Sequence, residues 1–302
     1  MNLQDNNCAC HPEAFGEVMF ETKDYNFNTT NATGFILSCI ECDSLYPDRF
    51  PTGECLEQVY DNYYTSVKQS SGLRTVFRWL LRKLQNTTTF RNTPLDACAI
   101  FDYGCGSGEY LQALSNSGHN GKLYGSDLVR PDTDDGFPFQ WLPMDLFDKS
   151  GNQFDWITMC HVLEHVSNPE KIVTRLASSL KVGGAIWIAT PNANSFLIDC
   201  FKGWARDVDF PRHRQIFSYT GLQELLSSCG LEIEFQRADR INSVINFGSC
   251  AKNLLGDSSI SLWLRLRVLS KALWRLINHM GLHRHLPDLE ATELVVICRK
   301  LT

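Results

Sequence analysis

The stretch FDYGCGSGEY places glycines at every second position behind Asp102: Gly104, Gly106 and Gly108. The apolar residues before it resemble a short buried strand, and the residues after it have helical spacing. Glycines at such a turn let a ligand reach backbone N–H groups and the positive end of a helix dipole. A plain structural turn is the alternative. The dinucleotide pattern G-x-G-x-x-G is not met, because Glu109 stands at its third glycine, and no G-K-[ST] of a phosphate loop follows.

Two carboxylates follow the next two predicted strands. Asp127 ends KLYGSD, a place where a carboxylate accepts hydrogen bonds from ribose hydroxyls. Asp145 follows the third strand in WLPMDLF and is placed to accept a bond from the exocyclic amine of an adenine. These acids favour a glycine turn that binds a nucleoside-containing ligand over a turn with only a structural role.

Candidate bases occur in two segments. FDWITMCHVLEHV carries His161, Glu164 and His165 behind the fourth strand, at the sheet edge where ligands bind. His161 is the first candidate for a general base, and the alternative is that Glu164 and His165 only brace the loop. RDVDFPRHRQIF carries His213, the second candidate base, and Arg212, which could hold a phosphate or carboxylate of the acceptor. A solvated charged loop is the alternative for that segment.

Strands and helices must position these residues. Apolar runs predict strands at 97–102, 122–126, 139–142, 154–160, 185–190, 231–236 and 293–298. Helical patterns lie at 73–84, 108–117, 168–180 and 219–229. Their alternation predicts an α/β fold with a mainly parallel, Rossmann-like, doubly wound sheet.

The motifs in this order resemble the class I S-adenosylmethionine-dependent methyltransferases, from about residue 97 to residue 236. The similarity rests on D-x-G-C-G-x-G at 102–108, H-x-L-E-H at 161–165 and P-R-H at 211–213. It implies S-adenosyl-L-methionine as cofactor, bound by Asp102, Gly104, Cys105, Gly106, Gly108, Asp127, Leu128, Asp145, Leu146 and Cys160. It also implies acceptor contacts from Tyr64, Asn192 and Arg212.

The resemblance implies methyl transfer to oxygen, or carbon, of a small or lipid-linked acceptor such as a sugar or related metabolite. A quinone- or lipid-type methyltransferase is the first alternative, and a noncatalytic S-adenosylmethionine-binding partner protein is the second. The chain lacks the D/N-P-P-Y signature of methylation at amino groups of nucleic-acid bases, and its net charge of −6 gives no general reason to bind nucleic acid.

Cysteines near the N-terminus have the spacing of a metal site. Cys39 and Cys42 are two residues apart, and CACH at 8–11 offers a second arm through Cys8 and His11. Sugar and natural-product methyltransferases of this subfamily carry a similar zinc ribbon, followed by a segment like YDNYY at 60–64. The first arm lacks the C-x-x-C spacing, so a degenerate ribbon without metal is the alternative. We expect a ribbon-like segment at 1–65 and a methyltransferase domain at 66–302, with a helical insertion at about 245–288.

Residues 258–287 contain no acid but hold several arginines and a lysine. Leu262, Leu266, Leu269, Leu273, Leu276 and Met280 follow helical spacing. A cationic amphipathic helix of this kind can lie in a membrane interface, or it can serve as a lid or a dimer contact. The polar N-terminus resembles no signal peptide, and no apolar run reaches the roughly 18 residues that span a bilayer, so we expect a cytoplasmic protein, with peripheral membrane contact as an option.

Overall fold

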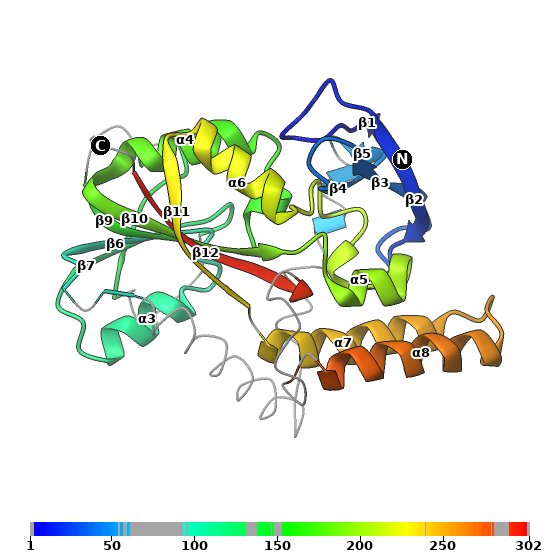
Figure 1. Ribbon diagram of the computed structural model, residues 1–302. Helices are drawn as coiled ribbons and strands as arrows, with labels where there is room; N and C mark the ends of the chain where they lie inside the picture. Colours follow the sequence, from blue (N-terminus) through cyan, green and yellow to red (C-terminus); the bar gives the residue numbers. More distant parts are fainter. Residues whose placement is uncertain are drawn as a thin grey trace. The chain divides into compact units, whose positions relative to one another are not determined.

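The computed structural model (Figure 1) describes residues 3–53, 55–56, 59–60, 93–94, 96–130, 138–145, 147, 153–238, 240–278, 280 and 290–300. The chain forms two compact units. The first comprises residues 1–78, 191–222 and 237–294, and the second comprises residues 79–190, 223–236 and 295–302.

The second unit is built on a seven-stranded sheet. Its strands are β6 (Ala99–Tyr103), β7 (Lys122–Ser126), β8 (Gln140–Trp141), β9 (Phe154–Cys160), β10 (Leu180–Pro191), β11 (Leu231–Ala238) and β12 (Glu293–Lys300). They follow the order β11-β12-β10-β9-β6-β7-β8. β6 pairs in parallel with both β7 and β9, so the chain winds outward from β6 in two directions. This confirms the predicted doubly wound sheet and puts its switch point between β6 and β9.

Burial explains why these segments are strands. All five residues of β6 are buried, as expected for a strand with both faces covered. Trp156 of β9 and Trp187 of β10 pack with Ile100 and Leu111 in one apolar core. β10 begins at Leu180, five residues before the predicted start, and its register against β9 shifts between Leu180 and Ala185.

The predicted helices along this sheet are confirmed. They are α3 (Glu109–Asn116), α4 (Pro169–Ser179) and α6 (Tyr219–Ser228). Asn168 caps α4 by accepting a bond from the Lys171 backbone N–H, and Pro169 occupies the first helical position. A short 3₁₀ helix, η1 (Leu163–His165), follows β9. Helix α3 thus starts close behind the carboxyl end of β6, and α4 follows β9 after η1, whereas α5, η2 and η3 separate β10 from α6.

The first unit combines small sheets with helices. β1 (Leu3–Asp5) pairs with β5 (Arg49–Pro51), and a second sheet has the order β2 (Gly16–Lys23), β3 (Thr33–Cys39), β4 (Leu45–Pro47). The helices are α5 (Phe196–Phe201), η2 (Lys202–Trp204), η3 (Arg206–Val208), α7 (Arg240–Gly256) and α8 (Leu262–Ile277). Leu45 and Ile216 exchange two backbone hydrogen bonds of 2.9 and 2.7 Å. This pair joins the N-terminal sheet to the segment after α5.

One apolar core holds this unit together. Ile36 and Leu45 from the N-terminal sheet belong to the same buried cluster as Phe201, Leu254 and Leu276. Helix α7 begins at Arg240, and both α7 and α8 contribute buried residues to the core that they share with the N-terminal sheet. The predicted boundary near residue 65 and the helix predicted at 73–84 lie outside the described residues.

Among the described residues, no helix is both long and apolar enough to cross a membrane.

Candidate active site

The glycine turn lies between β6 and α3 in the second unit. Gly104, Gly106 and Gly108 have φ angles of 82°, 53° and 77°, a region that strongly favours glycine. A Cβ on Gly104 would come 2.2 Å from Cγ2 of Val162 in the loop after β9. A Cβ on Gly106 would meet no protein atom within 4 Å. The turn is therefore closely packed at Gly104 and open at Gly106.

Asp127 ties this turn to the next strand. Its Oδ2 accepts a 2.7 Å hydrogen bond from the Gly106 N–H, and its Oδ1 accepts one of 2.7 Å from the Leu128 N–H. The carbonyl of Ser126 accepts bonds from the N–H groups of Gly104 and Cys105. The carboxyl ends of β6 and β7 thus fix the turn beside a partly exposed carboxylate. This is the edge of the sheet at which the sequence predicts a nucleoside ligand.

Asp102 is buried at the end of β6. The hydroxyl of Thr158, on β9, donates a 2.6 Å hydrogen bond to its Oδ1. Burial raises the pKa of Asp102 to about 7, because the charged form loses its hydration, and the Thr158 bond only partly opposes this. A nearby cationic group would favour the ionised form of this carboxyl.

His161 is held at the end of β9 by a buried carboxylate. Its Nδ1 lies 3.2 Å from Oε1 of Glu164, and Oε2 of Glu164 accepts a 3.0 Å bond from the Thr190 hydroxyl. The His161 backbone has a φ of 54°, and its N–H donates to the Ala189 carbonyl. The His161 side chain is 38% exposed, whereas that of Glu164 is fully buried. With Nδ1 donating to the carboxylate, Nε2 is the nitrogen that can accept a proton.

The other residues predicted in the second unit have different surroundings. His165 lies in η1 and is partly exposed. Cys160, Asp145 and Leu128 are exposed at the carboxyl ends of their strands. Leu146, predicted to bind the cofactor, and Tyr64, predicted to contact the acceptor, lie outside the described residues.

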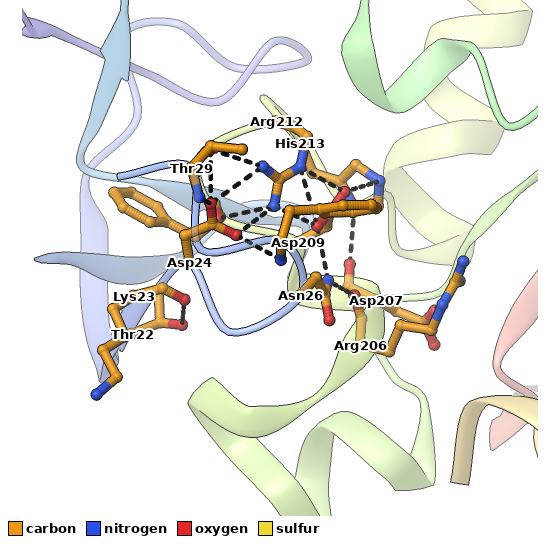
Figure 2. A network of polar contacts seen from close by, with 12 residues as sticks. Thr22, Lys23, Asp24, Asn26, Thr29, Arg206, Asp207, Asp209, Arg212 and His213 are labelled. Atoms are coloured by element: carbon orange, nitrogen blue, oxygen red, sulfur yellow. Dashed lines mark hydrogen bonds and ion pairs between the residues drawn. The ribbon is translucent and has the colours of Figure 1, made fainter. Parts of the chain in front are cut away.

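Arg212 is the centre of a buried ion-pair network in the first unit (Figure 2). Its Nη2 lies 2.6 Å from Oδ1 of Asp24 and 2.8 Å from Oδ1 of Asp209. The guanidinium also stacks over the ring of Phe27, at 4.4 Å from its centroid. No part of the Arg212 side chain is exposed. These contacts favour a structural role, and the acceptor contact expected from the sequence stays a prediction.

His213 and Asn192 are also buried in the first unit. Nδ1 of His213 donates a 2.8 Å bond to the Asp207 carbonyl, and its Nε2 faces Asp209 at 3.9 Å. Asn192 donates from its side-chain amide to the Ala291 carbonyl and accepts a bond from the Asn194 N–H. Both residues have protein partners in the structure, while their predicted roles stay predictions.

The N-terminal cysteines gather in one buried cluster of the first unit. Sγ of Cys8 lies 3.7 Å from Sγ of Cys42, and one donor atom from each of Cys8, Cys10 and Cys42 lies within 4.8 Å of the others. Cys39 is buried in the same cluster. An imidazole nitrogen of His11 lies within 4.8 Å of the Cys42 sulfur. Contacts with Cys10 and Cys42 lower the pKa of Cys8, so the cluster favours one thiolate.

Sequence reasoning missed several residues of these sites. Thr158 and Thr190 are the hydroxyls that hold Asp102 and Glu164, and they sit inside strands with no motif of their own. Cys10 joins the sulfur cluster although its one-residue spacing from Cys8 matches no common metal motif. Asp24 is the partner of Arg212 from 188 residues away. The sequence offers no local signal for a contact at such a separation.

Comparisons with known proteins agree with this fold. Residues 76–236 match the family model described as "Methyltransferase domain". The ubiquinone biosynthesis O-methyltransferase of Coxiella burnetii is 28% identical over 105 residues, which is 32% of this chain and 44% of that protein. The enzyme of the same name from Idiomarina loihiensis is 30% identical over 106 residues, or 32% and 43% of the two chains. This chain therefore spans less than half the length of these relatives.

A solved structure shares the fold at low sequence identity. It is the complex between the Haloferax volcanii Trm112 methyltransferase activator and a methyltransferase, with 16% identity and a TM-score of 0.51. The match covers 82% of this chain and 98% of the other. With the family model covering residues 76–236 and the sheet order observed here, the chain belongs to the methyltransferase-domain family, the class I S-adenosylmethionine-dependent methyltransferases.

Proposed function

We propose that this protein transfers the methyl group of S-adenosyl-L-methionine to a hydroxyl oxygen of a small or lipid-linked acceptor. The observation that carries the proposal is the glycine turn. Its Gly106 N–H is bound to Asp127, and a Cβ on Gly106 would point into open space. The turn fits the cofactor, because glycine lets the methionine part approach the backbone closely at Gly106 and the partly exposed carboxylate of Asp127 suits ribose hydroxyls.

His161 would act as the general base. Methyl transfer from a sulfonium is an in-line displacement, so positioning supplies much of the catalysis, and a hydroxyl acceptor must also lose its proton. The contact with Glu164 orients the imidazole and stabilises its protonated form, and the Thr190 hydroxyl fixes that carboxylate. This intact arrangement also argues against the noncatalytic alternative.

The named relatives bear on the acceptor. Two of them are O-methyltransferases of ubiquinone biosynthesis, which supports oxygen over carbon and a quinol-type acceptor over the sugar that the sequence resemblance suggests. Their similarity is confined to about 105 residues, so the acceptor is part of the proposal.

The proposal is tested by two measurements on the purified chain. Isothermal titration should show binding of S-adenosylmethionine and its demethylated product. A radiolabelled methyl-transfer assay should then show incorporation into catechol or quinol acceptors rather than sugars. Binding without transfer to any hydroxyl acceptor would favour the noncatalytic alternative, and lack of binding would contradict the whole proposal.

We further propose that the cysteine cluster holds a structural zinc ion. Tetrahedral zinc with Zn–S bonds of about 2.3 Å separates its sulfur ligands by about 3.8 Å. The Cys8–Cys42 separation of 3.7 Å fits this geometry. The donor atoms of Cys8, Cys10 and Cys42 lie close enough together to share one ion, and His11 lies beside Cys42 as a candidate fourth ligand. Cys39, the other ligand expected from the sequence, is buried in the same cluster, but its sulfur is not among these grouped donor atoms. Zinc would cross-link the N-terminal arm to the turn after β3.

The zinc proposal predicts about one zinc ion per chain in protein purified without chelators. Cys8→Ser with Cys42→Ser should remove the metal and lower the melting temperature, because metal binding is coupled to folding. Cys298→Ser is a matched control, since Cys298 is a buried cysteine of β12 outside the cluster. Metal analysis that finds no zinc, or equal zinc in the double variant, would contradict the site.

A further inference from the structure

Helix α8 exposes six large apolar side chains on one side. Leu262, Trp263, Leu266, Leu273, Trp274 and Ile277 are all exposed, and each tryptophan is 67% exposed. At 100° per residue these six side chains fall within about a third of the helix circumference. We call this surface the α8 face. Of the leucines expected from the sequence to form one helical stripe, Leu276 is buried and Leu269 is partly buried, whereas Leu262, Leu266 and Leu273 are exposed.

Helix α8 is held firmly on its opposite side. Ala272 and Leu276 are buried in the core of the first unit, where α8 packs against α5 and α7. Figure 1 shows α7 and α8 as a pair of long adjacent helices. Ser261 caps α8 by accepting a bond from the Leu264 N–H. The α8 face therefore belongs to a helix that is capped at its start and anchored in the core on its other side.

Basic residues flank the α8 face. Arg267 lies over the ring of Trp263, at 5.4 Å from its centroid, and Lys271 follows one turn later on the same side. Lys271 and Arg275 share the carboxylate of Asp199. Residues 258–287 contain no acid, so α8 itself carries only positive charges. Arg275 also pairs with Glu290, so acids outside α8 offset Lys271 and Arg275, while Arg267 adds a positive charge beside Trp263 at the edge of the face.

Composition and charge together favour one occupant. In a twofold contact between two copies, both Arg267 side chains would lie at the interface, and neither α8 carries an acid to pair with them. An anionic bilayer matches both features, because tryptophan and leucine side chains enter the interface while arginine and lysine meet lipid phosphates. We propose that the α8 face docks on the surface of an anionic lipid bilayer. The docking does not depend on the methyl transfer proposed above, although it would bring a lipid-linked acceptor to the enzyme.

Vesicle flotation tests this proposal on the full chain. The protein should float with phosphatidylcholine vesicles that contain phosphatidylglycerol, and less with phosphatidylcholine alone or at high salt. Trp263→Ser with Trp274→Ser should weaken binding at least about tenfold, because two large apolar side chains no longer enter the interface. Phe15→Ser is the matched control, since Phe15 is an 80% exposed aromatic outside α8, and it should bind like the parent.

A second experiment locates the contact. Vesicles with brominated acyl chains should quench tryptophan fluorescence of the parent protein. Trp263→Phe with Trp274→Phe keeps the face apolar, so this variant should still float but lose most of the quenching. Flotation that is absent, or equal in the serine double variant, overturns the proposal. A concentration-dependent dimer that the serine variant abolishes, without vesicle binding, overturns it in favour of a second copy. The same samples are also titrated with S-adenosylmethionine. Cofactor binding without vesicle binding contradicts only the docking, whereas vesicle binding without cofactor binding contradicts only the proposed function.

Discussion

At the scale of single residues, Gly106 is the most direct test of the cofactor site. Gly106→Leu should abolish S-adenosylmethionine binding in isothermal titration, because its side chain would fill the open space at the turn. The positive φ also costs about 1–2 kcal/mol for any other residue. Gly118→Leu is the control, because Gly118 has a φ of 83°, also meets no atom within 4 Å and lies after α3. It should lose similar stability but keep cofactor affinity. Equal cofactor affinity in both variants would contradict the site.

A second prediction at this scale concerns the base. His161→Ala should reduce turnover by about 10²–10⁴-fold while sparing cofactor affinity, the usual effect of losing a positioned base. Glu164→Gln should reduce turnover less, because the amide can still contact the imidazole but no longer offsets the positive charge that the base gains.

Kinetics of both histidine variants distinguish the two candidate bases. If His161→Ala keeps its turnover and His213→Ala loses it, with folding and cofactor binding intact in both, then His213 is the general base and His161 is not. If both variants keep near-normal rates, the acceptor needs no base and catalysis depends on positioning.

At the scale of elements, the sheet could be predicted from the sequence because each strand of the second unit is a local apolar run. The predicted strand at 154–160 matches β9, and the predicted helix at 219–229 matches α6 within one residue. The predicted start of β10 is too late. The first residues of the strand, around Gly183 and Gly184, form no apolar run, and they pair irregularly with β9. The strands of the N-terminal segment were missed, since polar and apolar residues in β2 and β3 do not alternate in step with burial: Val18 and Phe35 are exposed, whereas Thr22 is buried.

The Arg212 network supports a prediction about the loop that carries His213. Burial alone would raise the pKa of Asp209, but the charges of Arg212 and His213 outweigh it and lower this pKa to about 2. A free aspartate titrates near 3.9. The stabilisation is therefore complete above about pH 4 and is lost as the pH falls toward 2.

Thermal melting from pH 5 to pH 2 checks this prediction. Asp209→Asn should lower the melting temperature at pH 5 and flatten its fall toward pH 2. Asp199→Asn is the control, because the pKa of Asp199 is also lowered but its side chain is 46% exposed, so solvent screens its ion pairs. It should change the melting temperature little. An unchanged acid slope in Asp209→Asn would contradict the assignment.

At the scale of the whole molecule, the sequence predicted which motif residues of the second unit lie at one sheet edge, but not the contact partners in the first unit. The motif residues Asp102, Gly106 and Asp127 meet because neighbouring parallel strands bring their carboxyl ends to one edge, a rule that needs only strand order. Arg212 forms its ion pair with Asp24 because tertiary packing brings together two segments that are far apart in the sequence, and no local pattern specifies this packing. Short motifs predict contacts within one supersecondary unit, whereas contacts between distant segments depend on packing that a single sequence does not show.

The long-range packing makes it informative to test whether the chain divides into separate domains near residue 65, as expected from the sequence. Ile36 and Leu45 belong to the same core as Phe201 and Leu276, and Leu45 exchanges backbone bonds with Ile216. Removing residues 1–60 would expose this core and leave the buried Arg212 without Asp24. Breaking a buried ion pair in this way costs about 3–5 kcal/mol, and the lost apolar contacts add to it.

We therefore expect a chain of residues 61–302 to melt at a lower temperature than the full chain, or to aggregate, rather than to behave as an independent methyltransferase domain. Differential scanning calorimetry of both chains, with and without S-adenosylmethionine, measures this. Asp24→Asn in the full chain serves as the matched variant, since it removes the charge of one partner while leaving the N-terminal sheet and its core contacts in place. It should lose only part of the stability that the deletion loses. A chain of residues 61–302 that melts like the parent and binds the cofactor equally well would support the division at residue 65 and contradict a shared core.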